Sequence, residues 1–257
     1  MNRVGGNWLL GLLLPVGLAV GWEVMVDLGW ARDHLLPRGS TVIVTLARLA
    51  ASGELAAHVE ATLQRVALGF VFGVLSGTLL GSVTGYWTLA RRLFDPTLQA
   101  LRSIPSIAWV PMFILWFGIF ETSKVALIAV GVFFPIYLSL SDAIRGVDRK
   151  LVEVGRVFRF SHWEMITCVL LPATLPTYLV ALRSGLGLGW MFVVAAEFMG
   201  AESGLGFLLV DGQQTGRPAV ILGAIVAFAI LGKLTDWLLA TLSGRLLQWQ
   251  DSFKPAE

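Results

Sequence analysis

Charged residues are scarce in this chain. Only 14% of its 257 residues are Asp, Glu, Lys or Arg, whereas 56% are hydrophobic and the mean hydropathy is +0.76. A soluble domain carries about a quarter charged residues, so a deficit spread over the whole length indicates an integral membrane protein. The net charge of +2 is also too small to predict a surface that binds nucleic acid.

Residues that commonly carry catalysis or bind metals are also few. The single cysteine, Cys168, excludes an intramolecular disulfide, and the three histidines are too far apart for metal-ligand spacing. A phosphate-binding loop needs Gly-x4-Gly-Lys-Ser/Thr. The nearest sequence, Gly232-Lys233, has Ala227 at the first glycine position and Leu234 after the lysine. We therefore predict a chain without a metal site or a cofactor of its own, which does not hydrolyse ATP and is not an enzyme.

Long apolar runs are what the chain does contain. A membrane-spanning helix needs about 20 mostly apolar residues. Six segments meet or approach that length: Trp8–Leu28, Val66–Trp87, Ile104–Phe120, Val125–Ala143, Pro176–Phe198 and Val220–Leu242. The sequence therefore predicts an all-α, polytopic membrane protein of about six transmembrane helices in one domain, whose first helix is retained. A short turn around Glu121–Lys124 separates the third and fourth spans and predicts a helical hairpin.

The distribution of Lys and Arg predicts the orientation. With the N-terminus inside, eleven of the nineteen Lys and Arg fall in inside loops, Arg102 among them, and five fall in outside loops. Both termini are therefore expected in the cytoplasm, together with the segment Leu151–Pro172. The first outside loop, about Trp30–Thr62, is predicted to be an amphipathic connector, with an interfacial helix as the alternative.

Glycines recur every four residues in the second predicted span. They are Gly69, Gly73, Gly77, Gly81 and Gly85. Such a strip lets the backbones of two helices approach closely in lipid. Packing within the chain is the favoured interpretation, and a surface along which helices slide during transport is the alternative.

The segment after the fourth span is polar and carries two helix-start signals. Asp148 is a candidate N-cap for a short helix Arg149–Phe158. Ser161 followed by Glu164 has the form of a capping box that starts a second helix, and Pro172 and Pro176 are expected to end the segment and open the next span. An amphipathic loop returning to the membrane would suit this pattern, but the mixture of apolar and charged residues favours docking into a groove of a partner protein.

This segment resembles the EAA motif of the membrane subunits of bacterial ABC importers. That motif runs Glu-Ala-Ala, three residues, Gly, nine residues, Ile-x-Leu-Pro. The chain keeps this spacing with Glu153-Val154-Gly155, then Arg159 at the glycine position, then Val169-Leu170-Leu171-Pro172. The replacement of the glycine by Arg159 is the main departure from the pattern. It leaves the turn between the two short helices open.

Further matches place the resemblance in one branch of these permeases. His58-x3-Thr62-x2-Arg65-x3-Gly69-Phe70 is similar to the entry to the transport core, and Arg102-Ser-Ile-Pro105 is similar to the permeases for alkanesulfonates, taurine, nitrate and bicarbonate. The resemblance implies a type I importer permease fold. It divides the chain into an N-terminal helix and connector (residues 1–55), a transport core (56–245) with a coupling loop (145–172), and a cytoplasmic tail (246–257).

The resemblance also implies partners. The coupling loop would dock on separate ATPase subunits that bind ATP and Mg, through Glu153, Val154, Gly155, Arg156, Arg159, Phe160 and Pro172. A periplasmic or lipoprotein substrate-binding protein would deliver the solute, and two permease copies would form the pathway. The expected location is the bacterial cytoplasmic (inner) membrane.

Charged residues in or near the predicted spans are candidates for pathway or structural roles. Lys233 and Asp236 are three residues apart on one helix face, which predicts a structural pair. Arg183 is expected either to extend toward cytoplasmic water or to attract an anion in the pathway. Glu197 would repel an anion, which favours a hydrogen bond between helices or a gate. Trp190 could line the pathway, although packing is favoured.

Two other functions suit a polytopic membrane protein. A secondary transporter or channel predicts broken helices with polar residues at the midplane, whereas the predicted spans here are nearly all apolar. A membrane-embedded enzyme predicts clustered His, Asp or Glu at the lipid interface, and the sequence shows no such cluster. We therefore predict an importer permease for an anionic solute, with an aliphatic sulfonate favoured and nitrate, taurine or bicarbonate as further candidates.

Overall fold

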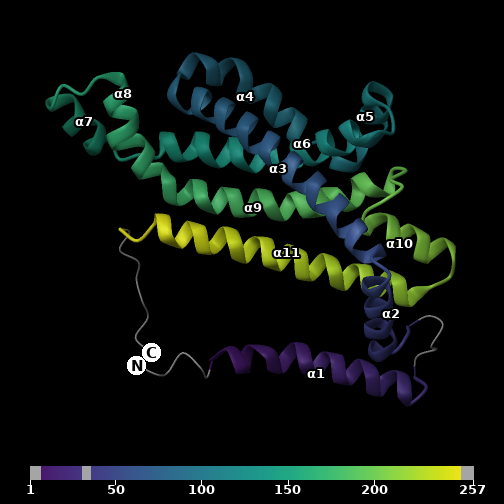
Figure 1. Cartoon of the computed structure of the whole chain (residues 1–257). Helices are drawn as coiled ribbons and strands as arrows, with labels where there is room; N and C mark the ends of the chain where they lie inside the picture. Colours follow the sequence, from purple (N-terminus) through teal and green to yellow (C-terminus); the bar gives the residue numbers. More distant parts are fainter. Residues whose placement is uncertain (1–6, 31–35, 250–257) are drawn as a thin grey trace. The chain divides into compact units, whose positions relative to one another are not determined.

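The computed structural model describes residues 7–30 and 36–249, and in this part of the chain every regular element is a helix (Figure 1). The α-helices are α1 (Asn7–Asp27), α2 (Gly39–Ala51), α3 (Glu54–Tyr86), α4 (Thr88–Arg102), α5 (Val110–Phe117), α6 (Glu121–Arg145), α7 (Arg149–Val157), α8 (His162–Met165), α9 (Leu171–Phe198), α10 (Leu205–Gln214) and α11 (Pro218–Leu246). A 3-10 turn, Ser106–Trp109, precedes α5, and a π-helical turn, Ile166–Leu170, precedes α9.

The helices form two compact units. One unit contains α1, α2, α10, the first turns of α3 and the first part of α11. The other contains the rest of α3, the whole of α4 to α9, and the second part of α11. In the second unit, α5 lies at one end of α6, and α7 and α8 lie beyond the opposite end (Figure 1).

Four helical segments are long and apolar enough to cross a membrane. They are α3, α6, the continuous segment His162–Glu197 that includes α8 and most of α9, and α11. These contain the second, fourth, fifth and sixth spans predicted from the sequence. The first predicted span coincides with α1, which has 21 residues.

The third predicted span, Ile104–Phe120, is not a continuous helix. Its helical part, α5, has eight residues and is therefore about 12 Å long, far less than the roughly 30 Å hydrocarbon core. The chain bends by 94° between α4 and the segment Ile107–Phe117. Pro105 causes the break, because its backbone is extended (φ −54°, ψ 134°) and a proline also keeps the preceding residue from helical geometry. The predicted hairpin to the next span is present, since Gly118 (φ 74°) ends α5 just before α6 begins.

The core of the second unit lies between α6 and α9. Ile128, Val132 and Ile136 recur every four residues on α6 and are fully buried, as is Val193 on α9. The glycine strip of α3 packs on the same helix, α6. A Cβ atom added to Gly73 would lie 2.6 Å from the Val132 Cβ atom and 2.7 Å from the Ala129 carbonyl oxygen. The strip therefore serves close packing within the chain.

The helix α9 begins earlier than the sequence predicted. Pro172 lies in its first turn, but Pro176, which was expected to open the span, lies inside the helix. The chain stays helical because the π turn joins α8 to α9, with the Leu171 amide bonded to the Ile166 carbonyl oxygen. The Thr174 hydroxyl also donates to the Leu170 carbonyl oxygen (2.8 Å), which satisfies an acceptor beside the prolines.

Candidate functional site

The segment with helix-start signals folds as two short helices, α7 and α8, which we call the α7–α8 hairpin (residues 148–165). Asp148 is the N-cap of α7, and its carboxylate accepts a hydrogen bond from the Lys150 amide (2.9 Å). Ser161 starts α8 in a complete capping box: the Glu164 amide donates to the Ser161 hydroxyl (3.2 Å), and the Ser161 amide donates to the Glu164 carboxylate (2.7 Å). Both predicted helix starts are confirmed.

The turn between the two helices is a Schellman motif. The Phe160 amide bonds the Gly155 carbonyl oxygen (3.0 Å), and the Arg159 amide bonds the Arg156 carbonyl oxygen (2.9 Å). Arg159 has φ 56° and is the sole non-glycine residue with positive φ in the described part of the chain. Glycine is the usual residue at this position of the motif. The turn therefore keeps the backbone that a glycine would favour, although Arg159 occupies it.

The hairpin divides the residues of the EAA-like motif between two faces. Gly155 is buried, and a Cβ atom there would lie 2.8 Å from the Met165 Cε atom and 3.2 Å from the Phe160 ring. Gly155 and Phe160 therefore close the hairpin. Glu153 and Val154 lie on the exposed face, where Arg149 donates to the Glu153 carboxylate (2.9 Å).

The exposed face of the hairpin is both apolar and charged. Its large apolar residues are Leu151, Val154, Val157, Phe158 and Trp163, which are 49–80% exposed. Arg156 lies on the opposite face with Val152, where both line a cavity of about 510 Å³ that also borders Tyr86 and Ile144. Arg156 was grouped with the docking residues from the sequence; it is exposed in the structure, and its part in docking stays a prediction.

A cluster of four charged residues, of which Arg65, Lys124 and Glu197 are buried and Glu121 is exposed, joins three membrane helices. Arg65 on α3 donates two hydrogen bonds to Glu121 at the start of α6 (2.6 and 2.8 Å) and one to Glu197 on α9 (2.8 Å). The Thr62 hydroxyl also donates to Glu197 (2.8 Å). Arg65 and Glu197 are 4% and 1% exposed. Lys124 completes the cluster with a bond to Glu121 (3.1 Å), so two cations balance two anions.

The sequence indicated only part of this cluster. It favoured a hydrogen bond between helices for Glu197, and the structure places Glu197 in such bonds. Arg65 was named only as part of the pattern that resembles the entry to the transport core, and Glu121 and Lys124 were assigned to a turn. A usable signal was present, because a buried arginine in a membrane segment needs a carboxylate partner. Among the described residues, no group of three or more His, Cys, Asp or Glu is placed to hold a metal ion.

The predicted pair of Lys233 with Asp236 is wrong. Asp236 on α11 instead accepts two hydrogen bonds from Arg183 on α9 (2.9 and 3.0 Å). The planar guanidinium matches both carboxylate oxygens, which a lysine three residues away on the same helix cannot do. Arg183 is therefore occupied by a carboxylate. Trp190 also joins α9 to α11, because its indole N–H donates to the Thr235 hydroxyl (2.9 Å).

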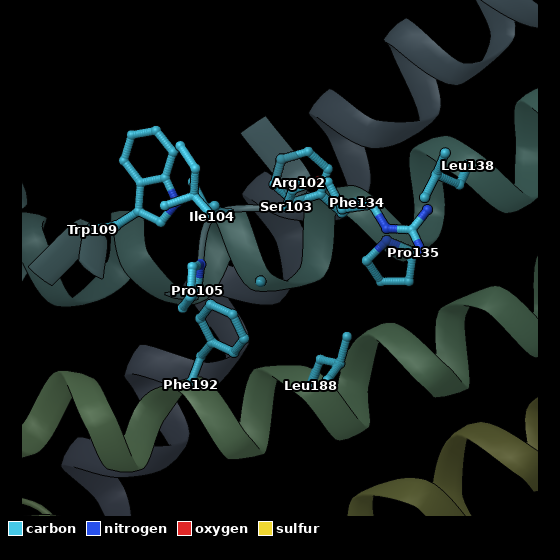
Figure 2. A pocket seen from close by; sticks show the side chains of 12 residues that line it. Arg102, Ser103, Ile104, Pro105, Trp109, Phe134, Pro135, Leu138, Leu188 and Phe192 are labelled. Carbon is cyan, nitrogen blue, oxygen red and sulfur yellow. The ribbon is translucent and has the colours of Figure 1, made fainter. Parts of the chain in front are cut away.

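A pocket of about 380 Å³ lies between the middle of α6 and the bend that follows the end of α4. Figure 2 shows the side chain of Arg102 directed toward Pro135, with Trp109 and Phe192 farther along the pocket. The sequence count placed Arg102 in a cytoplasmic loop, and the structure makes it the last residue of α4, where it lines this pocket. The helix α4 is held on α6 by a hydrogen bond from the Tyr137 hydroxyl to Asp95 (2.9 Å), which brings the end of α4 beside the centre of α6.

Three comparisons with known proteins agree with this architecture. The family model described as binding-protein-dependent transport system inner membrane component matches residues 69–248. The chain is 41% identical, over 96% of its length and 90% of the relative's, to a Bacillus subtilis protein provisionally named as an aliphatic sulfonates transport permease. It is 32% identical, over 92% of its length and 87% of the relative's, to the taurine transport system permease protein of Escherichia coli. In a solved structure of the inward-facing MetNI methionine ABC transporter, one chain shares the fold, with a TM-score of 0.61 and 22% identity over 73% of this chain and 92% of that chain.

Proposed function

Because the chain belongs to the family of binding-protein-dependent transport system inner membrane components, we propose that it forms the passage of an ATP-driven importer for aliphatic sulfonates. It is an ABC importer permease of the branch that contains alkanesulfonate, taurine and nitrate permeases. In our proposal a separate ATPase binds ATP and Mg and drives this chain through the α7–α8 hairpin. A substrate-binding protein delivers the solute, and two copies of the chain form the passage across the bacterial inner membrane.

The exposed face of the α7–α8 hairpin is the observation that carries this proposal. The side chains of Val157 and Phe158 are 80% and 70% exposed. These two residues lie outside the long membrane helices, so lipid is not expected to cover them. Both helix starts are capped and the turn is fully hydrogen-bonded, so the hairpin is already ordered without a partner. An ordered helical element that presents apolar anchors beside charges suits a groove on another protein.

The hairpin is connected so that it can pass movement to the membrane helices. Only the turn Gly146–Asp148 separates α7 from α6, and the π turn joins α8 directly to α9. The helices α6 and α9 share a fully buried interface, and the charge cluster of Arg65 ties both to α3. A displacement of the hairpin by the ATPase would therefore move these helices together as a rigid group, which is the motion that alternating access requires.

The solute and the orientation follow from the relatives and from the charge distribution. The relatives are named for aliphatic sulfonates, taurine and nitrate, and all of these solutes carry an anionic oxygen group. We favour an aliphatic sulfonate because the most extensive of these matches bears that name. The excess of Lys and Arg on one side supports an orientation with the hairpin and both termini in the cytoplasm, where an ATPase has access to ATP.

Reversing the charge at Glu153 tests the coupling role. The chain would be produced in cells together with the ATPase and the substrate-binding protein of the same importer. The uptake of labelled ethanesulfonate and the amount of the chain in the membrane would both be measured. Glu153→Arg adds a cation beside Arg149 and Lys150 on the exposed face, so we expect loss of uptake and of ATPase co-purification. The exposed Glu202 lies outside the hairpin, so Glu202→Arg is the matched control and should behave as the unmodified chain.

Two outcomes would count against the proposal. Normal uptake by Glu153→Arg at normal abundance would remove Glu153 from the coupling role. A chain that purifies in mild detergents only as a homo-oligomer, without any ATPase, would instead support a secondary transporter or channel.

A further inference from the structure

Arg102 is an exposed cation at the end of α4, beside the middle of α6, a helix long and apolar enough to cross a membrane. It lines a pocket together with Gly131, Pro135 and Leu138 of α6. The helix α6 runs from residue 121 to residue 145, so these residues lie within roughly 8 Å of its midpoint along the axis. A charged side chain beside the middle of a membrane-spanning helix marks by default a candidate functional site.

The guanidinium of Arg102 differs from three other cations of the membrane helices, whereas Lys233 on α11 resembles it in forming no ion pair among the described residues. Arg65, Lys124 and Arg183 each bond a carboxylate. Among the described residues, none forms a hydrogen bond or an ion pair with the Arg102 side chain, and the residues that line its pocket include no Asp or Glu. The pocket therefore presents a positive charge that no carboxylate of its lining balances.

The rest of the pocket complements the charge with apolar walls. Trp109, Phe134, Leu138 and Phe192 supply aromatic and aliphatic surface, and Ser103 adds a hydroxyl. The non-helical backbone around Pro105 forms one side. Irregular backbone at membrane depth is tolerated where it lines a cavity, and broken helices frequently form solute sites in transporters.

We propose that this pocket is a solute subsite of the passage, in which Arg102 binds the sulfonate group and the walls hold the alkyl chain. This inference rests on the proposed function and specifies where the solute makes contact. A guanidinium can donate two parallel hydrogen bonds to an oxyanion. The apolar walls at Trp109 and Phe192 then favour a solute that carries a short aliphatic chain. The pocket of about 380 Å³ has room for such a molecule.

The first test is binding to the purified full-length chain in nanodiscs of zwitterionic lipid. Ligand-observed NMR would measure 1-butanesulfonate, methanesulfonate and the neutral analogue 1-butanol. We expect saturable butanesulfonate binding that Arg102→Gln weakens by roughly tenfold or more. Methanesulfonate should bind more weakly by roughly fourfold for each buried methylene that it lacks. Arg92→Gln is the matched control, because Arg92 is an exposed arginine on the same helix outside the pocket, and it should bind as the unmodified chain.

Leu138→Asp guards against a folding effect of removing Arg102. Leu138 lines the pocket beside Arg102, and a carboxylate there would pair with the guanidinium without removing it. This variant should lose butanesulfonate binding as Arg102→Gln does. Binding by Leu138→Asp and Arg102→Gln equal to that of the unmodified chain would overturn the proposal.

Uptake by the complete transporter separates this inference from the proposed function. Loss of ethanesulfonate uptake in Arg102→Gln, with Arg92→Gln normal, supports both. Normal uptake in Arg102→Gln overturns the subsite and leaves the importer function standing. If the unmodified complex takes up no sulfonate while the chain binds butanesulfonate through Arg102, the pocket is an anion site, and both the proposed solute and its role in sulfonate passage are wrong.

Discussion

The glycine strip of α3 gives the sharpest test of the packing. In Gly73→Ala the new Cβ atom would meet the Val132 side chain at 2.6 and 2.9 Å and the Ala129 carbonyl oxygen at 2.7 Å. Ordinary contacts between such atoms are about 3.5–4.0 Å. One of the close atoms belongs to the backbone and cannot rotate away. The helices α3 and α6 must therefore separate by about 1 Å.

The expected magnitude follows from two opposing effects. Overpacking of this kind costs about 1–3 kcal/mol, whereas replacing glycine by alanine inside a helix gains about 0.5–1 kcal/mol. The chain offers a matched control in Gly187 on α9, where an added Cβ atom meets nothing within 4 Å. Gly187→Ala should show only the gain. The two variants should therefore differ in the free energy of unfolding by about 1–3 kcal/mol.

Thermal unfolding of the purified chain in detergent, followed by tryptophan fluorescence, measures this difference. For a chain of this length, 1 kcal/mol corresponds to about 2–4 °C, so Gly73→Ala should melt roughly 2–12 °C below Gly187→Ala. Adding Val132→Ala to Gly73→Ala should recover only part of the loss, because the carbonyl oxygen remains in place. A Gly73→Ala variant that melts at or above Gly187→Ala would refute the close approach of α3 to α6.

Three further changes test other contacts. Glu197→Ala removes the acceptor of Arg65 and Thr62 from a buried site and should lower the free energy of unfolding by about 2–4 kcal/mol. Glu197→Gln keeps an acceptor and should melt closer to the unmodified chain. Equal melting temperatures of the two variants would contradict this. Arg159→Gly relieves a left-handed backbone and should stabilise the hairpin by about 0.5–1 kcal/mol, measured as slower hydrogen exchange of the amide of residue 160; faster exchange would count against the Schellman turn. Asp236→Asn should cost less than about 1 kcal/mol, because the Arg183 side chain is 45% exposed; a loss above about 2 kcal/mol in the same unfolding assay would show that the pair is better shielded than its exposure indicates.

The features that the sequence predicted are those set by neighbouring residues. The N-cap at Asp148 and the capping box of Ser161 and Glu164 depend on groups two or three residues apart, so the sequence alone located them. The hydrophobic runs of α3, α6, α9 and α11 are likewise local. The break at Pro105 was missed because the apolar run continues through it. The length of that run predicted a continuous span, and the effect of the proline on the preceding residue was not considered.

The choice of partners for the charges could not be predicted in the same way. Asp236 has Lys233 one turn away, but the geometry of a guanidinium from α9 decides the pairing. Arg65 lies 56 residues from Glu121 and 132 residues from Glu197. Only the packing of α3, α6 and α9 brings these groups together. The position of Arg102 beside α6 was missed because the counting of loop charges uses only the order of residues between spans.

The division between paired and unpaired cations limits where solute charge can be recognised. In the Arg65 cluster and in the Arg183–Asp236 pair, each cation is balanced by a carboxylate, so neither presents net charge to a passing anion. Arg102 does. A unit charge 4 Å away would be attracted by about 1 kcal/mol in bulk water and by about 4 kcal/mol at an effective dielectric constant of 20. A cationic solute of the same size would be repelled by as much, which doubles the difference. Even the lower value therefore favours anions by more than tenfold, and this preference requires only the one arginine beside the centre of α6.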